Sequence, residues 1–150
     1  MKFRVFFAFI MMVCAISFMS SCEDEHYNMI MDLGGGGNYT IVNMGTNDTL
    51  KIEEGLYFNS GKNPTLVAHI GNVIKIKFTP KEEYKKYSFN IKYTLPNGKV
   101  VEDKPEYEYV IGDTLTGKYD IYLSAISFGK TEHDTWNISA NGVFTLKVVQ

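Results

Sequence analysis

Apolar and polar residues alternate along most of the chain from Tyr39 to its end. This period of two is typical of β-strands that bury one face and expose the other. Four runs are clear, at residues 74–78, 87–95, 119–124 and 144–148. Four shorter runs lie at residues 49–52, 66–68, 99–101 and 107–111. The pattern therefore predicts seven to eight short strands.

Residues that favour tight turns separate these runs, at Pro96-Asn97-Gly98, Gly112-Asp113, Gly129-Lys130 and Asn141-Gly142. No apolar pattern of helical spacing persists, and residues 80–87 suit only one short helical turn. Several short strands separated by turns favour an all-β fold, namely a single antiparallel β-sandwich over residues 39–150.

The first residues have the composition of a secretory signal peptide. Lys2 and Arg4 precede an apolar run at residues 5–18, and small residues follow in Ser20-Ser21-Cys22. This run is shorter than the roughly 20 residues of a transmembrane helix, so a cleaved signal over residues 1–21 is predicted. An acidic and glycine-rich tether at 22–38 follows, in which the Gly34-Gly35-Gly36-Gly37 run favours flexibility.

The Ser-Ser-Cys ending of this signal resembles the lipobox of bacterial lipoproteins. That resemblance implies that Cys22 is lipidated and becomes the first residue of the mature chain. The next residues, Glu23, Asp24 and Glu25, are similar to the acidic export signal of Bacteroidota-type surface lipoproteins. The expected location is therefore the outer membrane, lipid-anchored and facing the cell exterior.

The second half of the chain resembles the immunoglobulin-like and polycystic-kidney-disease-type (PKD-like) sandwiches of bacterial surface lipoproteins. The most characteristic stretch is Gly117-Lys118-Tyr119-Asp120-Ile121-Tyr122-Leu123-Ser124-Ala125, a glycine turn leading into a tyrosine-led core strand. The Trp-Asp-Phe-Gly-Asp-Gly core of typical PKD repeats is absent, and residues 93–98 stand in its place. The resemblance implies an immunoglobulin-like form of the predicted sandwich.

Composition excludes several kinds of partner and chemistry. After cleavage the chain has 129 residues, with 13 lysines, no arginine and 17 acidic residues, and thus a net charge of −4. A negative chain without arginine disfavours nucleic acid as a partner and bidentate recognition of anions. Because lipidation of Cys22 leaves no free thiol, no disulfide, cysteine nucleophile or cysteine zinc site is expected.

The remaining chemistry-bearing residues do not form a catalytic or metal motif. His26, His69 and His133 lack the spacing of a zinc site, so no metal or cofactor is expected. The acidic residues Glu102, Asp103, Glu106 and Glu108 cluster as on a charged strand edge, and Lys75, Lys77, Lys92 and Lys147 point outward and complement it. The chain is therefore predicted not to be an enzyme; two carboxylates about 5–10 Å apart in a cleft would reverse this view.

Aromatic residues make up 14% of the chain and carry its one compositional sign of recognition. Tyr87, Tyr93, Tyr107, Tyr109 and Tyr119 fall on predicted core faces. The candidates for ligand binding are Trp136, Tyr122 and Phe128. Trp136 follows a polar loop at an end of the sandwich, where loops normally bind ligands, although a tryptophan that caps the core is an equal alternative.

Two further tripeptides, Asp48-Thr49-Leu50 and Asp113-Thr114-Leu115, match the O-glycosylation sites of this bacterial group and make Thr49 and Thr114 candidate acceptors. Together these features favour a non-enzymatic surface binding module, for example an accessory in polysaccharide capture. The alternative is a structural or adhesive lipoprotein that docks on a larger outer-membrane protein complex through an edge strand.

Overall fold

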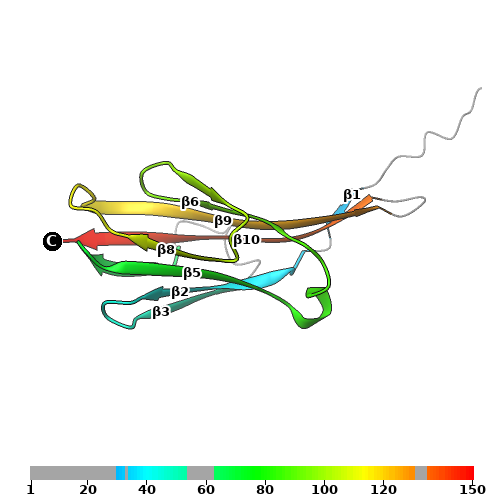
Figure 1. Cartoon of the computed structure of the whole chain (residues 1–150), viewed down its shortest axis with the longest axis horizontal. Helices are drawn as coiled ribbons and strands as arrows, with labels where there is room; N and C mark the ends of the chain where they lie inside the picture. Colours follow the sequence, from blue (N-terminus) through cyan, green and yellow to red (C-terminus); the bar gives the residue numbers. More distant parts are fainter. Residues whose placement is uncertain (1–29, 33, 54–62, 131–134) are drawn as a thin grey trace, which may run out of the picture.

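The chain folds into two β-sheets that lie face to face. The computed structural model describes residues 30–32, 34–53, 63–130 and 135–150. The larger sheet contains β1 (Ile30–Asp32), β4 (Thr65–His69), β6 (Asn90–Thr94), β7 (Val100–Glu102), β9 (Gly117–Lys130) and β10 (Thr135–Val149) (Figure 1). The smaller sheet contains β2 (Gly37–Asn43), β3 (Thr49–Glu53), β5 (Val73–Pro80) and β8 (Glu106–Val110). The predicted all-β sandwich is confirmed.

β9 and β10 form the longest element pair of the molecule. They pair antiparallel over 14 positions, from Thr135 opposite Lys130 to Val148 opposite Gly117. Along β10 the even-numbered residues from Ile138 to Val148 are buried and face the smaller sheet. The predicted run at 119–124 is thus the first part of a much longer strand, and the run at 144–148 is the last part of another.

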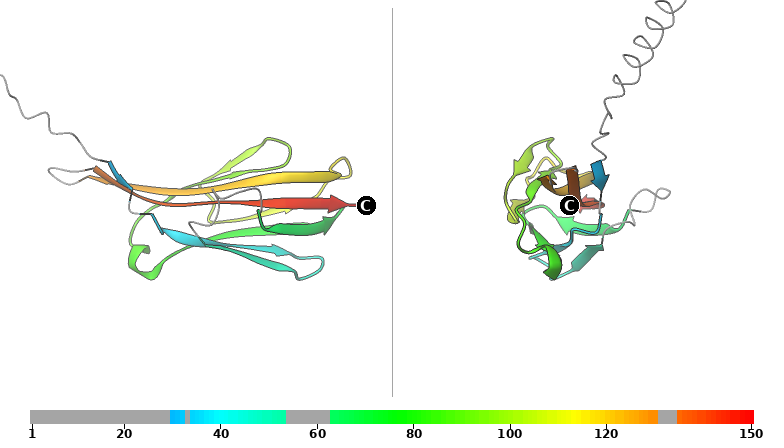
Figure 2. Two further views of the ribbon diagram at one scale, coloured as in Figure 1. Left: turned by 180° about the vertical axis from the view of Figure 1, so that it is seen from behind. Right: turned by 90° about the vertical axis from the view of Figure 1, so that its right-hand side faces the viewer.

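The other edge of β10 carries two short strands. β1 pairs with Thr135–Asn137, and β4 pairs with Thr145–Val149, both in parallel (Figures 1 and 2). The expectation of a purely antiparallel sandwich is therefore wrong for this edge. Alternation reports which face of a strand is buried but not the direction of its neighbour, and parallel partners leave no hairpin turn in the sequence.

The folded part begins earlier than the predicted boundary at residue 39. β1 lies within the predicted tether of 22–38, and β2 begins at Gly37. Gly36 and Gly37 are buried: a Cβ at Gly36 would lie 2.9 Å from Ile138 Cγ2, and one at Gly37 would lie 2.6 Å from Phe78 Cε2. These two glycines therefore permit close packing rather than flexibility.

The predicted turn at Asn141-Gly142 is wrong. Both residues lie in the middle of β10, where they pair with Ser124 and Leu123. A Cβ at Gly142 would lie 2.7 Å from Cγ2 of Ile52 on the facing sheet. This glycine brings the two sheets together instead of reversing the chain.

The other local predictions agree with the structure to different extents. Pro96-Asn97-Gly98 is a turn, in which the Gly98 amide donates to the Leu95 carbonyl over 2.9 Å, and the expected helical turn is the 3₁₀ helix η1 (Glu82–Tyr84). Gly129-Lys130 belongs to β9 instead of a turn, and the run at 87–95 contributes only β6. The described residues contain ten strands rather than seven or eight, because β1 and β2 were not among the predicted runs.

Aromatic rings join the two layers in the core. Tyr39 of β2 and Tyr93 of β6 are fully buried, with ring centroids 6.4 Å apart and an edge-on arrangement. The Tyr39 hydroxyl donates across the core to the Ala140 carbonyl of β10 over 2.7 Å. The Tyr93 hydroxyl donates to the Pro105 carbonyl over 3.2 Å, and burial raises the pKa of Tyr93 well above its usual value.

A buried amide closes one end of the sandwich. Asn43, the last residue of β2, donates through Nδ2 to the Val67 carbonyl of β4 and to Asn72 Oδ1, over 3.0 and 3.1 Å. Its own Oδ1 accepts from the Gly45 amide over 2.9 Å. Since a buried amide must satisfy its donors and acceptor, this network fixes β2 of the smaller sheet to β4 of the larger one.

Tyr39→Phe removes the hydrogen bond between the two sheets and leaves the Ala140 carbonyl buried without that donor. We expect a loss of about 1–3 kcal/mol in the free energy of unfolding, measured by urea denaturation. Tyr119→Phe is the control, because the Tyr119 hydroxyl donates to the Thr116 carbonyl in an exposed position. Equal stability of the two variants would contradict the importance of this hydrogen bond.

Gly142→Ala is expected to destabilise the sandwich by about 1–3 kcal/mol, because the new methyl group collides with Ile52. Combining it with Ile52→Ala, which removes the opposing methyl group, should cost less than the sum of the single changes in a double-mutant cycle. Gly112→Ala is the matched control, since apart from its two chain neighbours no described residue has an atom within 4 Å of its added Cβ. A strictly additive cycle would disprove the close contact.

Candidate functional site

The outer face of the larger sheet presents a row of side chains along β9. Ile121, Leu123, Ala125 and Ser127 are buried toward the core, so the intervening residues point outward. Two of them are large and exposed, Tyr122 with 58% and Phe128 with 67% of its surface accessible. Both were predicted as candidate ligand-binding residues, and both are confirmed as surface residues.

Neighbouring strands extend the apolar surface around Tyr122. By register, Tyr122 lies between Val143 of β10 and Thr94 of β6, and Thr94 pairs in turn with Val100 of β7. Val100 is also exposed, with 47% of its surface accessible, whereas Val143 is buried. Side chains on one face of directly opposed residues contact each other, so these four form one row across the sheet.

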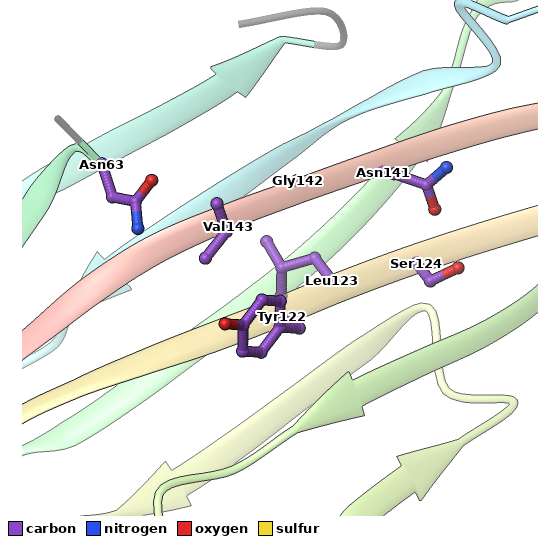
Figure 3. Close-up of a pocket in the computed structure, with 7 residues that line it drawn as sticks. All are labelled: Asn63, Tyr122, Leu123, Ser124, Asn141, Gly142 and Val143. Carbon is purple, nitrogen blue, oxygen red and sulfur yellow. The ribbon is translucent and has the colours of Figure 1, made fainter. Parts of the chain in front are cut away.

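Next to this row, a pocket of about 420 Å³ opens over β9 and β10. It is lined by Asn63, Tyr122, Leu123, Ser124, Asn141, Gly142 and Val143. Figure 3 shows Tyr122 and Val143 in the middle, Asn63 toward one end, and Ser124 with Asn141 toward the other. Its volume falls within the range of small-ligand sites in proteins.

Among the described residues that line this pocket, none has a charged side chain. Hydrogen-bond donors and acceptors lie beside the apolar Val143. They are the amides of Asn63 and Asn141, the hydroxyl of Ser124 and the phenol of Tyr122. Lys92, opposite Ser124 on β6, forms an ion pair with Glu102 over 2.7 Å. The pocket therefore suits an uncharged ligand that has both apolar and hydroxyl surfaces.

The third aromatic candidate, Trp136, lies elsewhere. It pairs with Gly129 and belongs to the even-numbered residues of β10, so it faces the opposite side of the sheet from Tyr122 and Phe128. Its ring is partly buried against Tyr87, edge-on with centroids 5.1 Å apart, and fills the space in which a Gly129 side chain would lie. The three candidates thus do not form one site.

Tyr122 and Phe128 share a face but not a pocket. They lie six positions apart along β9, which corresponds to roughly 20 Å in a strand. Phe128 lies opposite Asn137, whose Oδ1 is buried and has no hydrogen-bond partner among the described residues. The pocket is therefore built around Tyr122 alone.

The acidic cluster lies on strand edges, as the sequence predicts. Glu102 lies on β7, Glu106 and Glu108 lie on β8, and these strands end the larger and the smaller sheet respectively. Lys75 approaches Glu106 Oε1 at 2.6 Å and Glu108 Oε1 at 3.9 Å. The hydrogen bond from Lys75 lowers the pKa of Glu106, so this carboxylate stays charged on the edge.

The other predicted positions are dispersed. Cys22, Glu23, Asp24, Glu25, His26 and His133 lie outside the described residues. His69 is exposed, and its Nδ1 lies 3.0 Å from the Gln150 carbonyl. Thr49 and Thr114, the candidate O-glycosylation sites, are both exposed.

The core tyrosines are placed largely as expected. Tyr93 is fully buried, and Tyr107, Tyr109 and Tyr119 are partly buried and pack against the core. Burial, followed by the neighbouring Tyr107 and Tyr119, raises the pKa of Tyr109. Tyr87 instead contacts Trp136.

Asn63, Ser124, Asn141 and Val143 were missed as site residues by sequence reasoning. Asn141 was assigned to a turn, and the others carry no motif. Only the register of β9 against β10 brings Ser124 opposite Asn141 and Tyr122 opposite Val143. No local sequence signal specifies that register.

No family model matches the chain, and neither a curated protein nor a solved structure matches it. Within the described residues no group of histidine, cysteine and acidic side chains is arranged to hold a metal ion. The part of the chain that the structure describes contains no helix long and apolar enough to cross a membrane. The class that the structure defines is an all-β sandwich with a surface pocket whose described lining residues are uncharged.

Tyr87→Ala uncovers one side of the Trp136 ring. We therefore expect the Trp136 emission, the only tryptophan signal of the chain, to move to longer wavelength and to become more accessible to acrylamide. Tyr122→Ala should leave the emission unchanged, because Tyr122 lies on the opposite face of the sheet. The same shift in both variants would indicate a global change and refute the contact.

Proposed function

We propose that this protein is a non-enzymatic, lipid-anchored binding module of the cell surface, and that its pocket at Tyr122 binds a neutral polysaccharide. The observation that carries the proposal is the exposed Tyr122 ring beside an uncharged pocket lined by Asn63, Asn141 and Ser124. The signal sequence and lipobox support the location, and the acidic residues after Cys22 support export to the exterior.

The pocket chemistry suits a sugar better than a charged metabolite. An aromatic ring offers an apolar platform for the CH face of a pyranose, while amide side chains donate and accept hydrogen bonds with its hydroxyls. The lysine nearest to Ser124 by register, Lys92, is already paired with Glu102. An anionic polysaccharide would find no arginine and no lysine among the described residues of the pocket lining.

A non-enzymatic role is supported by the arrangement of the carboxylates. Glu102 and Glu106 each form an ion pair with a lysine of the neighbouring strand, whereas a glycosidase would place two carboxylates across a cleft. The same pairs weigh against docking through β7 or β8, because these two edge strands present charged groups to an incoming strand. We retain the immunoglobulin-like relationship as a proposal on the resemblance of residues 117–125.

Tyr122→Ala is expected to weaken binding of neutral polysaccharides at least about tenfold, equivalent to about 1.4 kcal/mol, because it removes the stacking platform. The measurement is affinity gel electrophoresis and calorimetry of residues 23–150 against starch, xylan, β-glucan and galactomannan. Asn141→Ala should weaken binding less, since it removes hydrogen bonds alone.

Phe128→Ala is the matched control, because Phe128 is an exposed aromatic residue on the same face but lies outside the pocket. Its affinity should equal that of the unmodified protein. Equal losses in the Tyr122 and Phe128 variants would show that the face as a whole binds. Absence of binding to every glycan tested would reject the proposed ligand class.

A further inference from the structure

The chain enters the sandwich at one defined end. β1 pairs with Thr135–Asn137, at the end of the β9–β10 pair where Thr135 lies opposite Lys130, whereas the C-terminal Gln150 lies at the opposite end (Figure 1). Cys22 precedes Ile30 by eight residues, which span at most about 28 Å when fully extended. If Cys22 carries the lipid, as the proposed function assumes, this end of the sandwich is held close to the membrane.

Aromatic residues gather at that same end. We call Trp136, Tyr87, Tyr84 and Phe128 the entry-end cluster. Trp136 contacts Tyr87, and Tyr87 contacts Tyr84 with centroids 6.4 Å apart. Phe128, next to the Gly129 that pairs with Trp136, is largely exposed. Trp136, Tyr87 and Tyr84 are all partly exposed rather than buried in the core.

The architecture explains why these rings are not part of the core. The small sheet begins at Gly37, which pairs with Pro80, and none of its described strands pairs beyond that point. The ends of β9 and β10 extend past it, as the left view of Figure 2 shows. The inner face of this extension is covered by Tyr87, from the connection between β5 and β6.

Cationic side chains accompany the rings. Lys86 Nζ lies 5.1 Å from the centre of the Tyr87 ring, and Lys85 pairs with Glu82. Tryptophan, tyrosine and lysine side chains favour the headgroup layer of a bilayer, because this layer solvates both their apolar parts and their polar tips.

We propose that the entry-end cluster rests on the lipid headgroups of the membrane to which Cys22 is attached. Trp136 and Phe128 lie in the interfacial layer, and the sandwich extends outward from it. The Tyr122 pocket, roughly 20 Å farther along β9 than Phe128, is then held above the headgroups and open to a soluble polymer. The occupant of this surface is thus the bilayer, selected by the short link to the anchor.

The test uses the full mature lipoprotein, reconstituted in vesicles of phosphatidylethanolamine and phosphatidylglycerol with brominated acyl chains. Trp136 is the only tryptophan, so its fluorescence reports on this end alone. We expect Trp136 to lose most of its fluorescence, and to lose more with bromines near the headgroups than with bromines near the chain ends. Co-flotation of the protein with the vesicles is measured in the same samples.

The control is Trp136→Phe combined with Val110→Trp. Val110 is exposed and precedes Ile111, whose carbonyl accepts from the Gly71 amide near the C-terminal end of the sandwich. This variant should float but remain unquenched. Flotation without quenching of Trp136, or equal quenching at both positions, would overturn the inference while leaving the anchor intact. A protein that does not float would reject the anchor and this inference together, whereas glycan binding would be unaffected.

Discussion

The long antiparallel ladder between β9 and β10 is the constraint on which the rest of the structure depends. Its 14 paired positions set which residues of both strands face the core. A slip of one residue would turn Tyr122 and Phe128 inward and expose Leu123 and Ala125, at the cost of the buried apolar surface. β6, β1 and β4 all pair directly with one of these two strands, so their positions follow from the same register.

Contacts between the layers hold the small sheet against this hairpin. Gly36 and Gly142 lack side chains where the opposite layer approaches to within van der Waals contact, and the Tyr39 hydroxyl reaches the Ala140 carbonyl through the core. Glycine is required at such positions by the space available rather than by backbone conformation. At the other end, the Asn43 amide connects β2 to β4, so the two layers are joined by both polar and apolar contacts.

The fold class could be predicted from alternation because burial of one face is recorded at every second residue, as in Ile74, Ile76 and Phe78. The glycines misled the prediction, since the sequence of Gly36-Gly37 or Asn141-Gly142 is the same whether glycine serves a turn or a close contact. β1 and the parallel partners of β10 left no signal because their pairing is between distant segments. The pocket could not be predicted for the same reason: Tyr122 is readable as an exposed aromatic residue, but Asn63 and Asn141 join it only through the fold.

The β9–β10 hairpin also connects the two proposed binding surfaces, namely the pocket at Tyr122 and the entry-end cluster that contacts the membrane. Trp136 lies on its inner face near the point where the chain enters, and Tyr122 lies on its outer face farther along. Because both strands are continuously paired, the distance between these residues is fixed by the ladder, in contrast to sites carried on separate loops. An orientation imposed at the membrane by the entry end is therefore transmitted to the pocket without a hinge. A short link to the anchor and a rigid hairpin together hold a small domain with its pocket directed away from the bilayer, which a long flexible tether alone does not achieve.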